Sequence, residues 1–417
     1  MTRPRAVVVV TGTELVRGDR HDLNGPFLAA ELHRLGLEAS RITIVGDRVE
    51  ELEAAIAEGL QSDVLVLSGG LGPTHDDRTI ELLGAAAGRK LEVDPELEAE
   101  IETVSRRIAE RLRRPYGEFA MGVRKQASLP VGALSLGLAG TAPGVVLETE
   151  RCVAIALPGP PAELQRLWEA ALRSDPLRRV LDRVQPPQRR VLRFFGASES
   201  MVARVLEQAG GERGGAEATV CARDYEVHVD LVGGGDALAS ALKRELAGYL
   251  FAEDERPVQE MVIDFCRDRG FKLATAESCT GGLVGAMLTS VPGSSEAFVG
   301  GVIAYSDEIK TRELGVSPAV LRDHGAVSAE AAEAMAQGIR DRLSADVGIS
   351  ATGIAGPGGG SAEKPVGLVF LHASSPDDSV AVDFVAHGDR QAIRRRAAVA
   401  ALHLVRRLLT QSRDEAA

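Results

Sequence analysis

The sequence predicts an α/β protein built from two three-layer αβα domains that are joined by a small α+β module. Residues 1–172 and 254–417 alternate short apolar runs with helical segments, the pattern of a sheet with helices on both faces. Residues 173–253 begin with a proline-rich basic segment and then change to another order of elements. A chain of 417 residues also exceeds one hydrophobic core. We therefore expect three parts.

The first region opens with an apolar run that has the length of a buried strand, and a helical segment follows it. That helix has Asn24 as a plausible cap and Gly36 as its stop. Two further apolar runs repeat the cycle, and a long charged helix with a proline start follows them. The expected strands are 6–10, 41–45 and 63–70, and the expected helices are 24–36 and 94–114.

The middle region starts as a linker or irregular crossover at 174–190, where three prolines lie among basic residues. A small α+β unit follows, with strands expected at 191–195, 219–223 and 226–232 and helices at 198–210 and 236–250. It holds no titratable cluster with catalytic spacing, so we interpret it as a connecting or dimerising module. From residue 254 to about residue 410 helices and strands alternate again.

Composition limits the classes of function. The net charge of −12 argues against broad nucleic-acid binding, and no apolar run is long enough to cross a bilayer. The four cysteines show neither metal spacing nor a disulfide framework. We expect a cytoplasmic protein with reduced thiols, no membrane partner and no nucleic-acid partner.

The stretch "ATAESCTGG" at 274–282 lies between an apolar run and a helical pattern, so it predicts a strand–turn–helix junction. Such a junction can expose a nucleophile and direct helix amides at an anion. Ser278 and Thr280 in this position are equally compatible with ordinary helix capping.

A glycine-rich turn follows the strand at 63–70 and carries Gly69, Gly70, Gly72 and Thr74. Glycines allow backbone amides to approach a phosphate closely. Asp76 and Asp77 in the same turn suggest a divalent cation between carboxylates and phosphate, and Asp47 ends a strand that should reach the same sheet edge. The alternative is a tight turn whose aspartates cap the next helix.

Motifs along most of the chain resemble the CinA family (competence/damage-inducible protein A). In the first region they are "TGTEL", "GGLGPTHDDRT", "RKQA", "GTAPG" and "LPGPPAEL". In the last region they are "TAESCTGG", "GGVIAYSDEIK", "HGAVS", "ATGIAGPGGG", "KPVG" and "GDR". The match is weaker at 175–250, where the family carries a KH-like module. The first region departs from the family pattern by lacking an Asn-Pro before "GTAPG" and an asparagine before Gln126.

The resemblance implies a molybdopterin-binding-like (MoCF) first domain that acts as a metal-dependent ADP-ribose pyrophosphatase. It also implies that the last domain deamidates nicotinamide mononucleotide in the pyridine nucleotide cycle, without a cofactor. We expect a homodimer whose ligands are these small nucleotides. The alternative is a non-catalytic adaptor that binds a nucleotide or pterin and serves competence or the DNA-damage response.

Amide hydrolysis needs a nucleophile, a base and donors for the oxyanion. Ser278 matches the family's nucleophile, with the amides of Cys279 and Thr280 as oxyanion donors, and Lys310 is the expected base with Tyr305 orienting it or relaying a proton. Cys279 is the rival nucleophile, and a solvated helix lysine is the alternative for Lys310.

The substrate phosphate needs a cradle of its own. The expected one combines the loop residues Thr352, Gly353, Gly356 and Gly358 with Arg390. The alternative for this loop is a flexible connection without a ligand.

Overall fold

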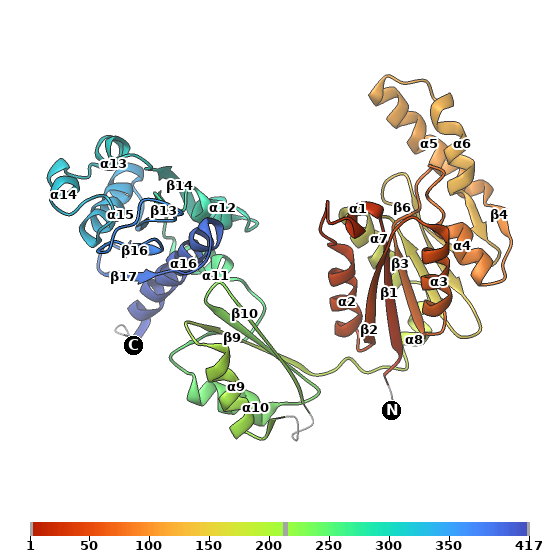
Figure 1. Ribbon diagram of the computed structural model, residues 1–417, viewed down its shortest axis with the longest axis horizontal. Helices are drawn as coiled ribbons and strands as arrows, with labels where there is room; N and C mark the ends of the chain where they lie inside the picture. Colours follow the sequence, from red (N-terminus) through yellow and green to blue (C-terminus); the bar gives the residue numbers. More distant parts are fainter. Residues whose placement is uncertain (1–2, 212–215, 415–417) are drawn as a thin grey trace. The chain divides into compact units, whose positions relative to one another are not determined.

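The computed structural model describes residues 3–211 and 216–414 (Figure 1). They form two compact units, the first ending at Pro187 and the second beginning at Gln188. The two units are described separately below. The α/β fold class predicted from the sequence is confirmed, whereas the domain boundaries expected at 172/173 and 253/254 stay predictions.

The first unit is built on a six-stranded sheet in the order β2-β1-β3-β8-β7-β6. Its first four strands run parallel, and β7 and β6 are antiparallel to their neighbours. The run of valines in the central strand β1 is buried on both faces of the sheet. The strands are β1 (Arg5–Thr11), β2 (Glu38–Val45), β3 (Val64–Ser68), β6 (Leu134–Leu138), β7 (Pro143–Glu148) and β8 (Val153–Leu157).

Helices cover both faces of this sheet, so each face has its own apolar core. Helices α2 (Asn24–Arg34), α7 (Pro161–Leu172) and α8 (Asp175–Leu181) pack on one face. Helices α3 (Val49–Gly59) and α4 (Thr79–Ala86) pack on the other. The remaining elements are α1 (Thr13–Val16), β4 (Leu91–Val93), α5 (Pro95–Leu112), α6 (Gly117–Gln126) and β5 (Ser128–Pro130).

The second unit begins with a four-stranded antiparallel sheet in the order β10-β11-β9-β12, with two helices packed on it. Ser198 caps the first of these helices, its Oγ accepting from the Met201 amide at 3.2 Å. The elements are β9 (Arg189–Phe195), α9 (Glu199–Gln208), β10 (Glu217–Arg223), β11 (Glu226–Val232), α10 (Asp236–Glu245) and β12 (Leu250–Ala252).

The rest of the second unit is a five-stranded sheet in the order β14-β13-β15-β16-β17. Strands β14 and β15 run parallel to β13 on its two sides, so the carboxyl ends of all three meet at one edge. Strands β16 and β17 are antiparallel. The strands are β13 (Leu273–Glu277), β14 (Phe298–Ile303), β15 (Val347–Gly353), β16 (Leu368–Ser374) and β17 (Ser379–Val385).

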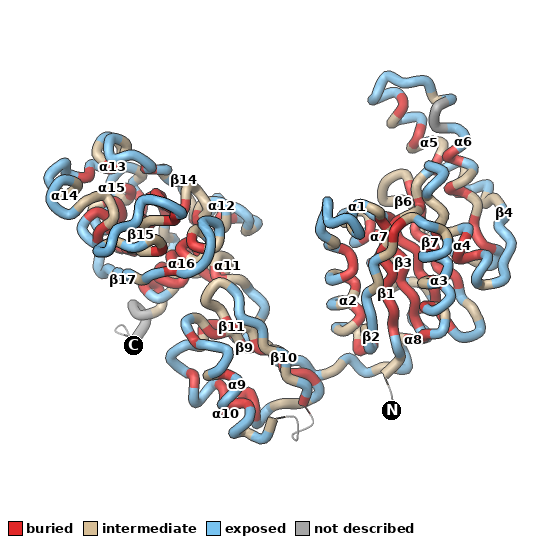
Figure 2. The backbone as a smooth tube through the Cα atoms, viewed as in Figure 1, coloured by how far each residue is buried: buried red, intermediate tan, exposed pale blue. Residues whose placement is uncertain are grey.

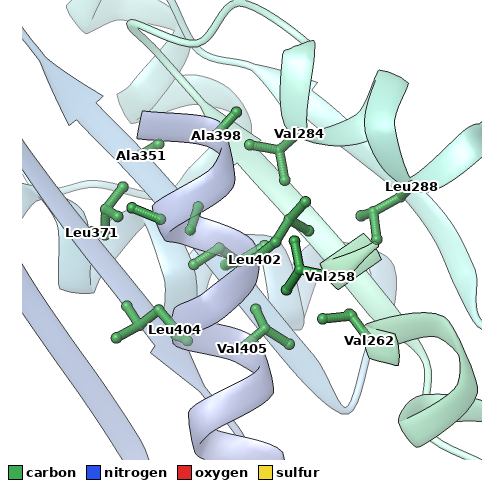
Figure 3. Close-up of a cluster of buried hydrophobic side chains, with 14 of the residues drawn as sticks. Val258, Val262, Val284, Leu288, Ala351, Leu371, Ala398, Leu402, Leu404 and Val405 are labelled. Carbon is green, nitrogen blue, oxygen red and sulfur yellow. The ribbon is translucent and has the colours of Figure 1, made fainter. Parts of the chain in front are cut away.

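Helices again cover both faces of the sheet. Helices α11 (Val258–Arg269), α12 (Leu283–Thr289) and α16 (Arg390–Asp414) share one core, part of which Figure 3 shows around Leu402 and Val405. Helices α13 (Asp307–Leu314) and α15 (Ala329–Leu343) cover the other face. The remaining elements are a short 3₁₀ helix (Ser294–Glu296) and α14 (Pro318–Asp323).

Along the helices, buried residues alternate with exposed ones, because one side of each helix packs against a sheet. The central strands of both units are buried (Figure 2). No helix within the described residues is both long enough and apolar enough to cross a membrane.

Candidate active site

The turn after β13 is organised by Glu277, a residue that the sequence analysis left without a role. Its carboxylate is buried and accepts from the amides of Val284 at 3.0 Å and Gly285 at 2.8 Å. Gly281 and Gly282, with φ of 60° and 91°, carry the chain through the turn. Glu277 therefore satisfies the first amides of α12 and fixes where that helix begins.

Ser278 follows directly and lies in a buried position beside Lys310. The backbone amide of Ser278 donates to Ala351 O at 2.8 Å, which ties the turn to β15. The Nζ of Lys310, from α13, lies 3.4 Å from Ser278 Oγ. The two residues predicted as nucleophile and base are thus brought together, although 32 residues separate them in the chain.

The surroundings of Lys310 favour a neutral amine. The residue is 1% exposed, and Nζ donates to Ala304 O at 3.1 Å. Among the described residues its ion-pair partner is the carboxylate of Asp307, at 3.8 Å, whose side chain is 63% exposed. Burial lowers the pKa of Lys310, and the attraction of Asp307 opposes this only in part. The alternative of a solvated helix lysine is therefore wrong.

Donor groups surround the same turn. The amides of Cys279 and Thr280 contact the Cys279 thiol and, like the amide of Gly282, donate to no oxygen within the described part of the chain. The Thr280 hydroxyl is buried there without a hydrogen-bond partner. Amide and hydroxyl donors next to a hydroxyl nucleophile are what an oxyanion requires.

Arg394 of α16 was missed in the sequence analysis. Its Nη2 donates to Thr280 O at 2.8 Å and so anchors the turn from the opposite side. The sequence contained a signal for it, because Arg394 comes four residues after Arg390 and therefore lies on the same face of the helix.

Cys279 has the wrong environment for a nucleophile. Its thiol is buried, and this burial raises its pKa to about 12. Since the thiolate is the reactive form, a thiol of this kind is inert at neutral pH.

Tyr305 does not have the neighbour expected for it. Its ring is 63% exposed, and its hydroxyl accepts from Arg390 Nη2 at 3.0 Å, not from Lys310. The prediction that Tyr305 orients Lys310 is corrected accordingly: at the end of β14 its side chain turns outward, whereas Lys310 turns inward from α13. Arg390 also donates from Nη1 to Gly356 O at 2.6 Å, so it joins Tyr305 to the glycine-rich loop.

That loop has two kinds of residue. The Thr352 hydroxyl is buried and donates to Ala326 O at 2.7 Å, so it holds a neighbouring loop and does not face a ligand. Gly353 lies against the backbone of β16, where a Cβ would come within 2.7 Å of Leu368 O. Gly356 has φ of 71°, and Gly358 faces open space. Gly356 and Gly358 therefore remain candidates for a phosphate contact, whereas Thr352 and Gly353 do not.

The glycine-rich turn of the first unit follows β3. Gly69 and Gly70 have φ of 99° and 67°, and a Cβ at Gly72 would collide with the Asp77 carboxylate. The hydroxyl of Thr74 contacts Asp76 and donates to Asp77 Oδ2 at 2.6 Å. Contact with the Thr74 hydroxyl lowers the pKa of Asp76. A cavity of about 190 Å³ adjoins this turn, lined in part by Gly70, Gly72 and Asp77.

Asp47 does not join Asp76 and Asp77. Its two carboxylate oxygens accept from the hydroxyl of Thr11 at 3.1 Å and from the hydroxyl and amide of Thr13 at 2.6 and 3.1 Å. No group of three or more His, Cys, Asp or Glu side chains within residues 3–211 and 216–414 is arranged to hold a metal ion. The predicted three-carboxylate site is therefore wrong, and Asp76 and Asp77 alone remain as acidic ligands in the turn.

Comparison with known proteins gives matches in both units. The "CinA C-terminal domain" family matches residues 255–409, and the "Probable molybdopterin binding domain" family matches residues 7–178. A CinA-like protein of Mycolicibacterium paratuberculosis is 40% identical, over 98% of this chain and 99% of its own length. Another, of Mycolicibacterium gilvum, is 42% identical over 97% and 99%. The crystal structure of competence/damage inducible protein CihA from Agrobacterium tumefaciens is 36% identical and covers 38% of this chain and 99% of its own, with a TM-score of 0.36.

Proposed function

Because this chain belongs to the CinA family, we propose that its second unit is an amidase that hydrolyses nicotinamide mononucleotide to nicotinic acid mononucleotide and ammonia. One observation carries the proposal: a serine hydroxyl at a strand–helix turn lies 3.4 Å from a fully buried lysine amine. A serine hydroxyl needs a base to become a nucleophile, and a desolvated lysine can serve as that base.

In the first step Ser278 Oγ attacks the carboxamide carbon, and its proton passes to the neutral amine of Lys310. The lowered pKa of Lys310 matters here, because only the unprotonated amine accepts a proton. The carbonyl oxygen becomes an oxyanion, to which the amides of Cys279 and Thr280 in the turn would donate.

In the second step the Lys310 ammonium returns the proton to the amide nitrogen, which leaves as ammonia. An ester between Ser278 and the nicotinic acid carbonyl remains. Water then attacks the ester carbon with Lys310 as the base again, and the serine hydroxyl and the carboxylic acid are released. One amide and one water give one acid and one ammonia, so the reaction consumes no oxidant or reductant.

The substrate's phosphate is assigned to Arg390 and the amides that follow Gly356. Arg390 donates one N–H to Gly356 O and another to the hydroxyl of Tyr305. Its Nε and the remaining hydrogens of Nη1 and Nη2 can donate to an anion. Tyr305 is exposed, so its ring is open to the pyridine ring or the ribose of a bound nucleotide.

Ammonia release from nicotinamide mononucleotide tests this proposal. Ser278→Ala should lower the rate by at least about 10³-fold, because the nucleophile is removed. Cys279→Ala is the matched control on the neighbouring residue and should stay within about threefold of the wild type. An inactive Cys279 variant beside an active Ser278 variant would refute the assignment.

For the first unit we propose a metal-dependent pyrophosphatase acting on ADP-ribose. The support is a glycine turn that combines backbone amides with the two carboxylates of Asp76 and Asp77. These two residues would hold the ion, which would neutralise charge on the pyrophosphate; magnesium is often bound by one or two carboxylates together with substrate phosphates.

The other candidate is an adaptor that binds a nucleotide or pterin without turnover. A buried lysine beside a serine favours the enzyme, since ligand binding alone does not need a desolvated amine. Ammonia release separates the two, because an adaptor would release none. The homodimer expected from the family stays a proposal.

A further inference from the structure

A cavity of about 690 Å³ lies inside the second unit, away from Ser278, between the four-stranded sheet and the outer side of β17 and α16. Its volume is that of a pocket for a drug-sized molecule. It is bordered on one side by residues near the ends of β9, β11 and β12, and on the other by residues of β17 and the middle of α16.

Aromatic side chains line this cavity. Tyr225 meets Phe384 edge to face, with ring centroids 5.7 Å apart, and Phe195 stacks on His403 at 3.8 Å. Tyr249, 38% exposed, also lines it. Aromatic faces and edges that are not fully covered by protein offer stacking and edge contacts to another planar ring.

The charge of the lining has one sign. Arg406 and Arg407 both line the cavity, and no aspartate or glutamate is among its lining residues in the described chain. Neither arginine forms an ion pair within the described residues, although Arg406 donates to His403 Nδ1 at 3.4 Å. The chain as a whole carries a net charge of −12, so a pocket with arginines and no carboxylate stands out from the rest of it.

A buried carboxylate beside the cavity is held by hydrogen bonds from two histidines. Glu226 accepts from His403 Nε2 at 2.8 Å and from His228 Nε2 at 2.9 Å. These bonds turn the carboxylate toward the two histidines, and Glu226 is not among the lining residues. Glu226 also attracts Arg406, so Arg407 is the lining arginine for which the described residues show no carboxylate partner.

We propose that this cavity binds a small planar aromatic molecule that carries a phosphate or carboxylate, such as a nucleotide. The ring contacts Tyr225, Tyr249 and Phe384, and the anionic group pairs with Arg407 and Arg406. The site is distinct from the proposed amidase site, because neither Ser278, Lys310 nor Arg390 is among its lining residues.

Photoaffinity labelling of the full-length protein with 8-azidoadenosine 5′-monophosphate tests the location. We expect the label on peptides that contain Tyr225 or Tyr249, and we expect AMP to compete with it. Adenosine and inorganic phosphate, each carrying half of the recognised chemistry, should compete at least about tenfold more weakly than AMP.

Variants test the contacts. Arg407→Gln is exposed and should fold normally, and it should weaken AMP competition about tenfold through the loss of a charge-assisted contact. Tyr249→Ser should weaken it by a similar factor through the loss of ring contact. Arg107→Gln, an exposed arginine of α5 outside the cavity, is the matched control and should leave labelling unchanged, as should Ser278→Ala.

Four results would overturn the proposal. The first is a label confined to other peptides, and the second is an Arg407→Gln variant that binds AMP like the wild type. The third is inorganic phosphate that competes as well as AMP. The fourth is competition by a single-stranded oligonucleotide more than about a hundredfold better than AMP, which would indicate a nucleic-acid surface. None of these results depends on amidase activity, so failure here is distinguishable from failure of the proposed function.

Discussion

Replacing Lys310 with methionine removes the proposed base and keeps a straight side chain of similar length. The lost atom is the Nζ that lies 3.4 Å from Ser278 Oγ, in a residue that is 1% exposed. Because a buried amine does not contact the substrate's phosphate, ground-state binding should persist. A general base is worth roughly 10²–10⁴ in rate. We therefore expect kcat to fall by that factor, about 3–5 kcal/mol, with KM within about threefold.

The same variant has a predictable effect on stability. Burial lowers the pKa of Lys310 from its ordinary value of 10.5, so between the lowered pKa and 10.5 the unfolded chain holds more protons than the folded one. The stability of the wild type should therefore rise with pH across that window. Lys310→Met should lack this part of the slope. It leaves Ala304 O without one donor, which costs about 1–3 kcal/mol, and it removes the cost of burying the amine.

Ammonia release under steady-state conditions measures kcat and KM, and urea denaturation at several pH values measures the free energy of unfolding. Lys272→Met is the matched control, because Lys272 is exposed and precedes β13 at the end opposite Ser278. A Lys310→Met variant with a KM defect alone would move this residue into substrate binding. Retention of more than about a tenth of the wild-type kcat would refute the reasoning.

The remaining predictions concern three carboxylates. Glu277→Gln places an amide NH₂ against one of the two helix amides that the carboxylate accepts, so we expect urea denaturation to show a loss of about 2–3 kcal/mol. Asp77→Ala should lower pyrophosphate cleavage to the level found with EDTA, while ammonia release should not change; a loss of both would argue for one shared site. Burial acts to raise the pKa of Glu226, but hydrogen bonds from His228 and His403 outweigh it and lower the pKa to about 2. Its stabilising contribution is thus present above pH 4.5 and lost toward pH 2, so thermal melts of Glu226→Gln should fall less steeply over that range.

The sequence was most informative where a local pattern decides the structure. The apolar runs and the glycine-rich turns predicted the strand–turn–helix junction at Ser278, because such signals act over a few residues. The contact between Ser278 and Lys310 has a different origin. It depends on β14 pairing with β13 and on α13 returning over the sheet, and this long-range pairing has no local signature.

The failures have a common physical reason. Asp47 and Thr352 have residue types suited to ligands, yet their polar atoms are satisfied by neighbouring loops. The sequence shows which groups can donate or accept, but not which partner reaches them first. The "TGTEL" stretch held a clue, because its two threonine hydroxyls are donors of the kind that Asp47 accepts. The prediction that Tyr305 orients Lys310 failed for a related reason, because nothing in the local sequence indicates to which side of the sheet edge its ring turns.

The burial of Cys279 has a consequence for oxidative conditions. Burial raises the pKa of this thiol to about 12 and so keeps it protonated at pH 7, whereas peroxide and alkylating reagents attack the thiolate. A cysteine next to the nucleophile would otherwise be the first target of oxidation, and a sulfenic acid there would disturb the turn. Because the thiol stays protonated, the amidase proposed for this unit should keep working through oxidative stress that inactivates enzymes with cysteine nucleophiles.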